Sequence, residues 1–129
     1  MEYRYYLANA SLTLRIVEFL HDRPELRLEY VTIIHRLEGW VVRIKLQQSL
    51  GPQTAGDFQA LLLELGVPYQ APPLIERALQ ALAAGESALK VMQDYQVAVV
   101  SHGPPMLSEI EAFREHFIQG LGYCPSNLA

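Results

Sequence analysis

The stretch that decides the fold is residues 30–47, with the sequence YVTIIHRLEGWVVRIKLQ. Apolar and polar side chains alternate on both sides of Glu38-Gly39, which is typical of two antiparallel strands joined by a tight turn. If these two residues form the whole loop, Leu37 pairs with Trp40. That register gathers seven apolar side chains on one face, with His35 as the only polar member.

The opposite face of this hairpin is mixed in character. It carries the basic side chains of Arg36, Arg43 and Lys45 together with Tyr30, but also one isoleucine and one valine. Because apolar side chains lie on both faces, we expect the hairpin to form the centre of a sheet that is partly covered on both sides.

The residues before the hairpin predict a strand and then a helix. Residues 3–9 are rich in alternating aromatic side chains, as expected for a strand. Residues 11–22 fit either a strand or one face of a helix, and their length favours a helix capped by Ser11. If this segment were a strand instead, the chain would be a small β-meander followed by a helical half.

The residues after the hairpin predict four helices and one short strand. Thr54 is the expected N-cap of the first helix, and Gly66 is its expected left-handed C-cap. The expected helices span about residues 55–65, 73–84, 87–94 and 107–121, and the expected strand spans residues 97–100. Residues 101–105, Ser-His-Gly-Pro-Pro, are predicted to form a loop.

Together these elements predict a single α+β domain over residues 1–129, in which helices pack on an antiparallel sheet. Apart from extra helices, the order of elements resembles the βαββαβ topology of a ferredoxin-like sandwich. The resemblance implies that residues 97–100 form the last strand, with helices on one face of the sheet. No sequence motif of a known family accompanies it.

The composition indicates a cytoplasmic protein that associates with other proteins. Half of the residues are hydrophobic, and the net charge of −4 disfavours general binding to nucleic acid. Residues 1–50 are near +1, whereas residues 51–129 are near −5. No apolar run approaches the roughly 20 residues that span a bilayer, and the single cysteine, Cys124, fits a reducing compartment. The apolar excess predicts contact with another protein or another copy of the chain.

Two histidines are the most informative candidates for a binding site. His35 is placed on an apolar face, where a neutral imidazole could bind a ligand, transfer a proton or respond to pH. His102 follows the predicted strand and precedes a helix, with the hydroxyl of Ser101 beside it. Each also has a structural interpretation, as a hydrogen-bonded core histidine and as part of a rigid connection.

The sequence offers no coherent catalytic set, no metal site and no cofactor motif. No two histidines have the spacing of metal ligands. Trp40, together with Phe113 and Phe117 of the last helix, is a candidate anchor for a partner. Arg36 and Arg43 on the basic hairpin face are candidate contacts to a partner or to RNA.

We therefore expect a small interaction, regulatory or assembly module without catalytic activity, which docks another protein or self-associates. An alternative is a small enzyme or small-molecule-binding protein with a pocket near His35 and His102. A weaker alternative is an RNA-contacting protein that uses the basic hairpin face. The expected binding residues are His35, Arg36, Trp40, Arg43, Ser101 and His102.

Overall fold

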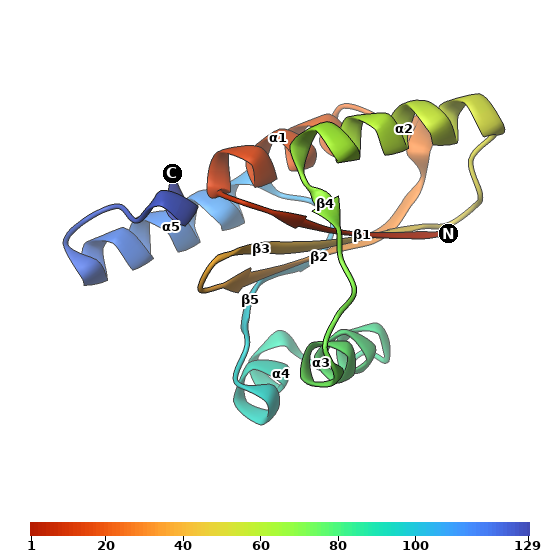
Figure 1. Ribbon diagram of the computed structural model, residues 1–129. Helices are drawn as coiled ribbons and strands as arrows, with labels where there is room; N and C mark the ends of the chain where they lie inside the picture. Colours follow the sequence, from red (N-terminus) through yellow and green to blue (C-terminus); the bar gives the residue numbers. More distant parts are fainter.

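The computed structural model describes residues 1–129 as three layers, with a five-stranded sheet between two layers of helices (Figure 1). The elements are β1 (Glu2–Leu7), α1 (Ala10–His21), β2 (Leu28–Arg36), β3 (Gly39–Leu46), α2 (Pro52–Leu65), β4 (Val67–Pro68), α3 (Pro73–Ala83), α4 (Ala88–Tyr95), β5 (Ala98–Gly103) and α5 (Leu107–Leu121), with short 3-10 helices at Pro24–Leu26 and Ser126–Leu128. Helices α1, α2 and α5 cover one face of the sheet, and α3 and α4 cover the other.

Every strand runs antiparallel to its neighbours, in the order β4-β1-β3-β2-β5. The predicted α+β fold around a central hairpin is therefore confirmed. The chain from β1 to β4 follows the βαββαβ order, but its last strand is the two-residue β4, which the sequence pattern does not show. Strand β5, which the pattern predicts in that role, extends the sheet at the opposite edge, beside β2.

The hairpin of β2 and β3 has the predicted faces but not the predicted pairing. Its loop is Leu37-Glu38, and His35 pairs with Trp40. The register is shifted by two residues from the prediction, and a shift of two keeps each strand residue on its face. The exception is Leu37, which the pattern places on the apolar face but which lies in the turn with 92% of its surface exposed.

Residues 10–21 form helix α1, so the ambiguous segment is a helix and the alternative of a β-meander is wrong. The cap is Asn9 rather than Ser11. The side-chain oxygen of Asn9 accepts a hydrogen bond of 3.0 Å from the backbone N–H of Leu12. Asparagine is as good a cap as serine, so sequence preference alone does not choose between them.

Helix α2 begins earlier than predicted. Gly51 is its N-cap and Pro52 lies in its first turn, so Thr54 is inside the helix. A proline in the first turn has no N–H to lose, and its fixed φ suits a helix. Gly66 is extended, with φ −161°, rather than left-handed. A Cβ there would lie 2.5 Å from the carbonyl oxygen of Tyr6, so close approach to β1 requires the glycine.

Strand β5 is longer than predicted, because residues 101–103 continue it and pair with β2. The predicted loop is therefore wrong in its first three residues. A register shift between Val99 and Ser101 leaves Val100 as an extra residue, which is a β-bulge. Serine, histidine and glycine have little preference for strands, so only the pairing with β2 shows that they continue one.

Two separate hydrophobic cores join the layers. The larger one lies between the sheet and α1, α2 and α5, and it includes Ile33 and Trp40. The smaller one lies between the sheet and α3 and α4, and it includes Ile34 and Val41. Each face of the hairpin thus supplies one core, because successive side chains of a strand point to opposite faces.

The segment 125–129 closes one end of the larger core. Leu128 is fully buried, and the indole Nε1 of Trp40 donates a hydrogen bond of 2.6 Å to the carbonyl oxygen of Asn127. The side-chain amide of Asn127 donates another, of 2.6 Å, to the carbonyl oxygen of Leu37. These contacts hold the hairpin loop in place.

Candidate functional site

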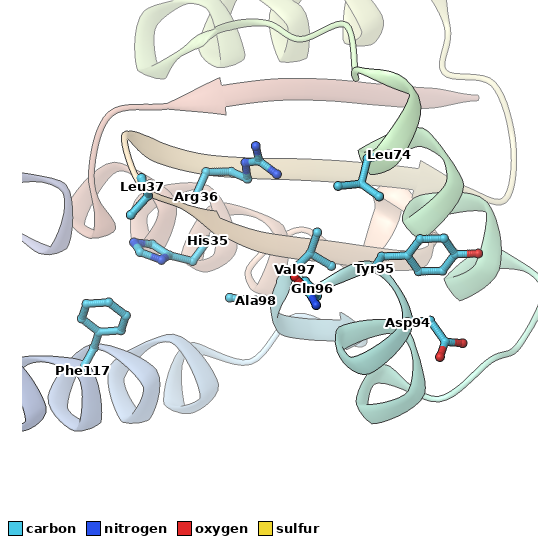
Figure 2. A pocket seen from close by; sticks show the side chains of 10 residues that line it. All are labelled: His35, Arg36, Leu37, Leu74, Asp94, Tyr95, Gln96, Val97, Ala98 and Phe117. Atoms are coloured by element: carbon cyan, nitrogen blue, oxygen red, sulfur yellow. The ribbon is translucent and has the colours of Figure 1, made fainter.

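The largest groove on the surface has a volume of about 630 Å³ and lies at the tip of the hairpin (Figure 2). Five elements line it: the hairpin loop with the end of β2, the first turn of α3, the end of α4, the start of β5, and α5. Two of the predicted binding residues, His35 and Arg36, belong to it.

The floor of the groove is apolar. It is lined by Val97, just before β5, by Ala98 at the start of β5 and by Phe117 of α5. Leu37 and Leu74 border it with 92% and 48% of their surfaces exposed. Exposed apolar side chains that gather around a concave surface mark binding sites far more often than isolated ones do.

Two charges of opposite sign flank this floor. Arg36 comes from the end of β2 and Asp94 from the last turn of α4, and Figure 2 shows them on opposite sides of Val97. Neither side chain takes part in any of the ion pairs of the structure. Because neither charge has an ion-pair partner within the protein, each could form one with a bound molecule.

His35 lies on the apolar face, as the alternation predicts, and is 7% exposed. Its ring centroid is 4.9 Å from that of Trp40, 5.1 Å from that of Phe113 and 5.3 Å from that of Phe117. The side-chain amide nitrogen of Asn127 lies 3.4 Å from Nε2 of the ring and also donates to the carbonyl oxygens of Arg36 and Leu37. Burial lowers the pKa of His35, because the charged ring would lose its hydration.

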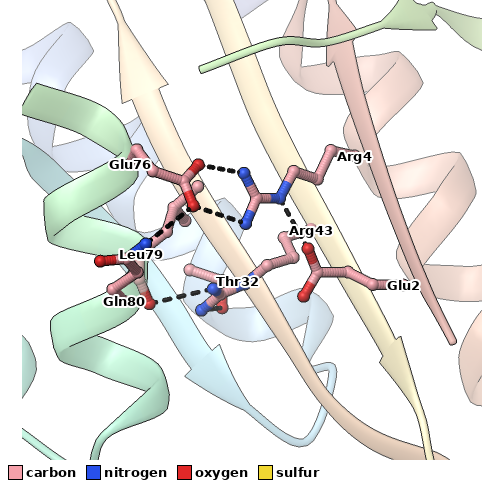
Figure 3. A network of polar contacts seen from close by, with 7 residues as sticks. All are labelled: Glu2, Arg4, Thr32, Arg43, Glu76, Leu79 and Gln80. Atoms are coloured by element: carbon pink, nitrogen blue, oxygen red, sulfur yellow. Dashed lines mark hydrogen bonds and ion pairs between the residues drawn. The ribbon is translucent and has the colours of Figure 1, made fainter. Parts of the chain in front are cut away.

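His102 belongs to a different polar cluster on the other face of the sheet. The Thr32 hydroxyl lies 2.7 Å from its Nδ1 and accepts a hydrogen bond of 3.0 Å from Arg43 Nη2. Arg43 also donates to the carbonyl oxygen of Leu79 at 2.9 Å (Figure 3). Its guanidinium lies 4.9 Å above the ring of Tyr30. Its Nε is buried without a partner.

Arg43 is therefore not part of an exposed basic face. It is 1% exposed, because α3 and the sheet enclose it. Burial lowers its pKa, although a guanidinium stays charged at neutral pH. The hairpin face that was a candidate for contacting RNA is largely buried against α3 and α4 in the smaller core. The alternation of residue types does not reveal this burial.

The structure does not bring His35 and His102 together. His102 pairs with Thr32, which is three residues from His35 along β2. An odd offset along a strand places two side chains on opposite faces. Ser101, the neighbour of His102, is 4% exposed. The structure therefore contains no single pocket lined by both histidines.

The aromatic side chains expected to anchor a partner divide into two groups. Trp40 is fully buried in the core, and Phe113, whose ring lies 5.7 Å from that of Trp40, is partly buried and packs against this core. Phe117 lines the groove. Leu74 and Tyr95 also line the groove but are not among the predicted binding residues, because ordinary helical spacing gives no sign that the fold brings them to the hairpin tip.

An ion pair on the second face ties the sheet to α3. Arg4 of β1 holds Glu76 of α3 through two hydrogen bonds and also pairs with Glu2 at 2.7 Å (Figure 3). The hydrogen bond from Arg4 lowers the pKa of Glu76. Because these side chains satisfy one another, we interpret them as structural.

We expect the protein to lose stability as the pH falls from about 7.5 to about 5.5. Burial lowers the pKa of both His35 and His102, and the charge of Arg43 lowers that of His102 further. In this range the unfolded chain binds protons that the folded protein does not, so acid favours unfolding until the folded histidines are protonated as well. Urea unfolding at the two pH values measures the loss.

A His102→Asn variant is the control for this pH effect. It removes one of the two histidines whose pKa is lowered in the folded protein, so the urea concentration at the midpoint of unfolding should change less with pH than in the wild type. A wild-type midpoint that is the same at both pH values would contradict the expectation.

Comparison with known protein families, with curated proteins and with solved structures found no match to this chain. No three side chains of the metal-binding types cluster closely enough to hold an ion. None of the helices combines the length and the apolar character needed to cross a membrane.

Proposed function

We propose that this chain is a protein-interaction module without catalytic activity, and that its partner docks in the groove at the hairpin tip. The observation that carries the proposal is the position of Leu37. It is the most exposed of the large apolar side chains and lies beside a concave apolar surface. In the free protein this side chain stabilises the fold little, whereas burial against a partner would be favourable.

The chemistry of the groove supports docking better than catalysis. Its volume is within the range of roughly 300–1,000 Å³ that is common for binding sites. No serine, threonine or cysteine lines it, and Nε2 of its only histidine, His35, faces Asn127. A bound side chain would contact apolar groups and two charges.

We also propose a cytoplasmic location. The support is Cys124, the only cysteine, which is exposed and unpaired. A reducing compartment keeps such a thiol free.

Selection from a displayed library of short random peptides tests the docking proposal. We expect enriched peptides that bind the wild type and bind a Leu37→Glu variant at least about tenfold more weakly, because a charge replaces a central apolar contact. Leu89→Glu is the matched control, since Leu89 is 63% exposed but lies outside the groove. No enrichment, or an equal loss in both variants, would refute the proposal.

Another copy of the chain is the second candidate for the partner, and the high hydrophobic content supports it. In that case light scattering shows a dimer, and Leu37→Glu converts it to a monomer.

A further inference from the structure

We propose that, if the groove docks a partner as proposed above, its occupant is an extended segment of another protein with one apolar anchor between an acidic and a basic side chain. The charges of the groove then fix the direction in which the segment binds.

We infer that the bound segment inserts an apolar side chain because the floor of the groove is apolar. Val97, which is 6% exposed, together with Ala98 and Phe117, forms a surface that offers no charge to an inserted side chain. Leu37 and Leu74 stand beside it and would cover that side chain from outside. The anchor would thus lose contact with water on several sides, which is where binding energy concentrates.

We infer the two charged residues of the bound segment from Asp94 and Arg36, because neither forms an ion pair within the protein. Lys90 lies one helical turn before Asp94 and close enough for the Asp94 charge to contribute to its raised pKa, but it forms its ion pair with Glu86, at 2.9 Å, so Asp94 has none. On the other side of the floor, Arg36 has no pair with Glu38 or any other carboxylate. A segment with an acidic residue toward Arg36 and a basic residue toward Asp94 satisfies both charges.

An extended conformation suits the polar ring atom that the groove offers. The hydrogen-bond contact of the His35 ring is at Nε2, with Asn127, and Nδ1 has no partner within the protein. His35 lines the groove, so a backbone group of the bound segment can form a hydrogen bond with Nδ1. Extended segments present their backbone groups for such contacts, whereas a helix uses them internally.

The charges of the groove do not by themselves exclude a second copy as the occupant, because its lining carries one charge of each sign, Arg36 and Asp94. Light scattering distinguishes a second copy from a segment of another protein.

Two synthetic peptides of identical composition test the proposed direction. Both carry a central leucine, and they differ only in whether the glutamate precedes and the lysine follows it or the reverse. By fluorescence anisotropy we expect wild type to prefer one of them by about tenfold, since two exposed charge pairs contribute. A protein with both Arg36→Glu and Asp94→Lys should prefer the other peptide, and salt at about 1 M should remove the preference.

Equal binding of the two peptides to wild type, or a preference that the double charge reversal leaves unchanged, overturns the proposal. If neither peptide binds while library selection yields binders that depend on Leu37, the charge pattern is wrong and the docking groove stands. If no such binders exist, both proposals fail. A dimer that Leu37→Glu dissociates would make the second copy the occupant and overturn the proposed segment.

Discussion

Replacing Gly39 with alanine is expected to lower the free energy of unfolding by about 3 kcal/mol or more. A Cβ at this position would lie 2.5 Å from the carbonyl oxygen of Leu7 and 2.8 Å from the ring of Tyr6. The carbonyl belongs to β1, which pairs with β3 along its whole length and cannot retreat without loss of strand pairing. Close approach of the two strands therefore requires a glycine.

Gly56→Ala is the matched control. This glycine is exposed inside α2, and a Cβ there would meet nothing within 4 Å. Alanine favours a helix over glycine by roughly 0.5–1 kcal/mol, so the control should gain stability. Denaturant unfolding of both variants measures the difference. A loss below about 1 kcal/mol for Gly39→Ala would show that β1 and β3 separate easily.

Replacing Trp40 with alanine is expected to cost about 3–5 kcal/mol of stability. The side chain is fully buried, packs against His35 and Phe113, and donates a hydrogen bond to the carbonyl oxygen of Asn127. Its removal leaves a cavity at the meeting point of the hairpin, α5 and the segment 125–129. Denaturant unfolding with two spectroscopic probes measures the loss.

Trp40→Phe separates packing from hydrogen bonding at the same position. It keeps an aromatic ring but loses the N–H that binds the Asn127 carbonyl oxygen. We expect a loss of roughly 1–2 kcal/mol from the missing hydrogen bond and the smaller ring. Hydrogen exchange should also quicken in residues 125–129. If Trp40→Phe is as unstable as Trp40→Ala, ring packing is not the main contribution.

For the hairpin, the sequence pattern predicted the two faces correctly but not the position of the loop. Alternation assigned every strand residue to its correct face, because the two faces depend only on whether a position is odd or even. The predicted loop was one residue too far along the chain, which shifts the strand pairing by two residues, because Gly39 resembles a turn glycine. The structure requires a glycine at position 39 because Tyr6 and Leu7 of β1 lie against it. That strand is more than thirty residues away in the chain, so the residues around Gly39 give no sign of this contact.

The two edge strands were harder to predict for the same reason. Strand β4 has only two residues, one of them Pro68, and exists because it pairs with β1. Such a strand is too short for any periodicity. In β5, His102 and Gly103 belong to the strand only through their pairing with β2. In both strands, pairing with a strand distant in the chain determines which residues are extended.

Only the part of the candidate site that the hairpin contributes was predicted from the sequence. His35 and Arg36 follow from the hairpin pattern, but Leu74 and Asp94 reach the groove through the path of α3 and α4. The burial of Arg43 could not be foreseen, since an arginine among alternating residues normally indicates an exposed face.

The most direct test of the docking groove is an amide-resolved NMR titration of the wild type with the preferred leucine-centred peptide. We expect the largest chemical-shift changes at Leu37, Gln96 and Ala98, and we expect them to vanish in the Leu37→Glu variant. Changes centred on the outer surfaces of α1 and α2, or changes that Leu37→Glu leaves intact, would contradict the groove as the docking site.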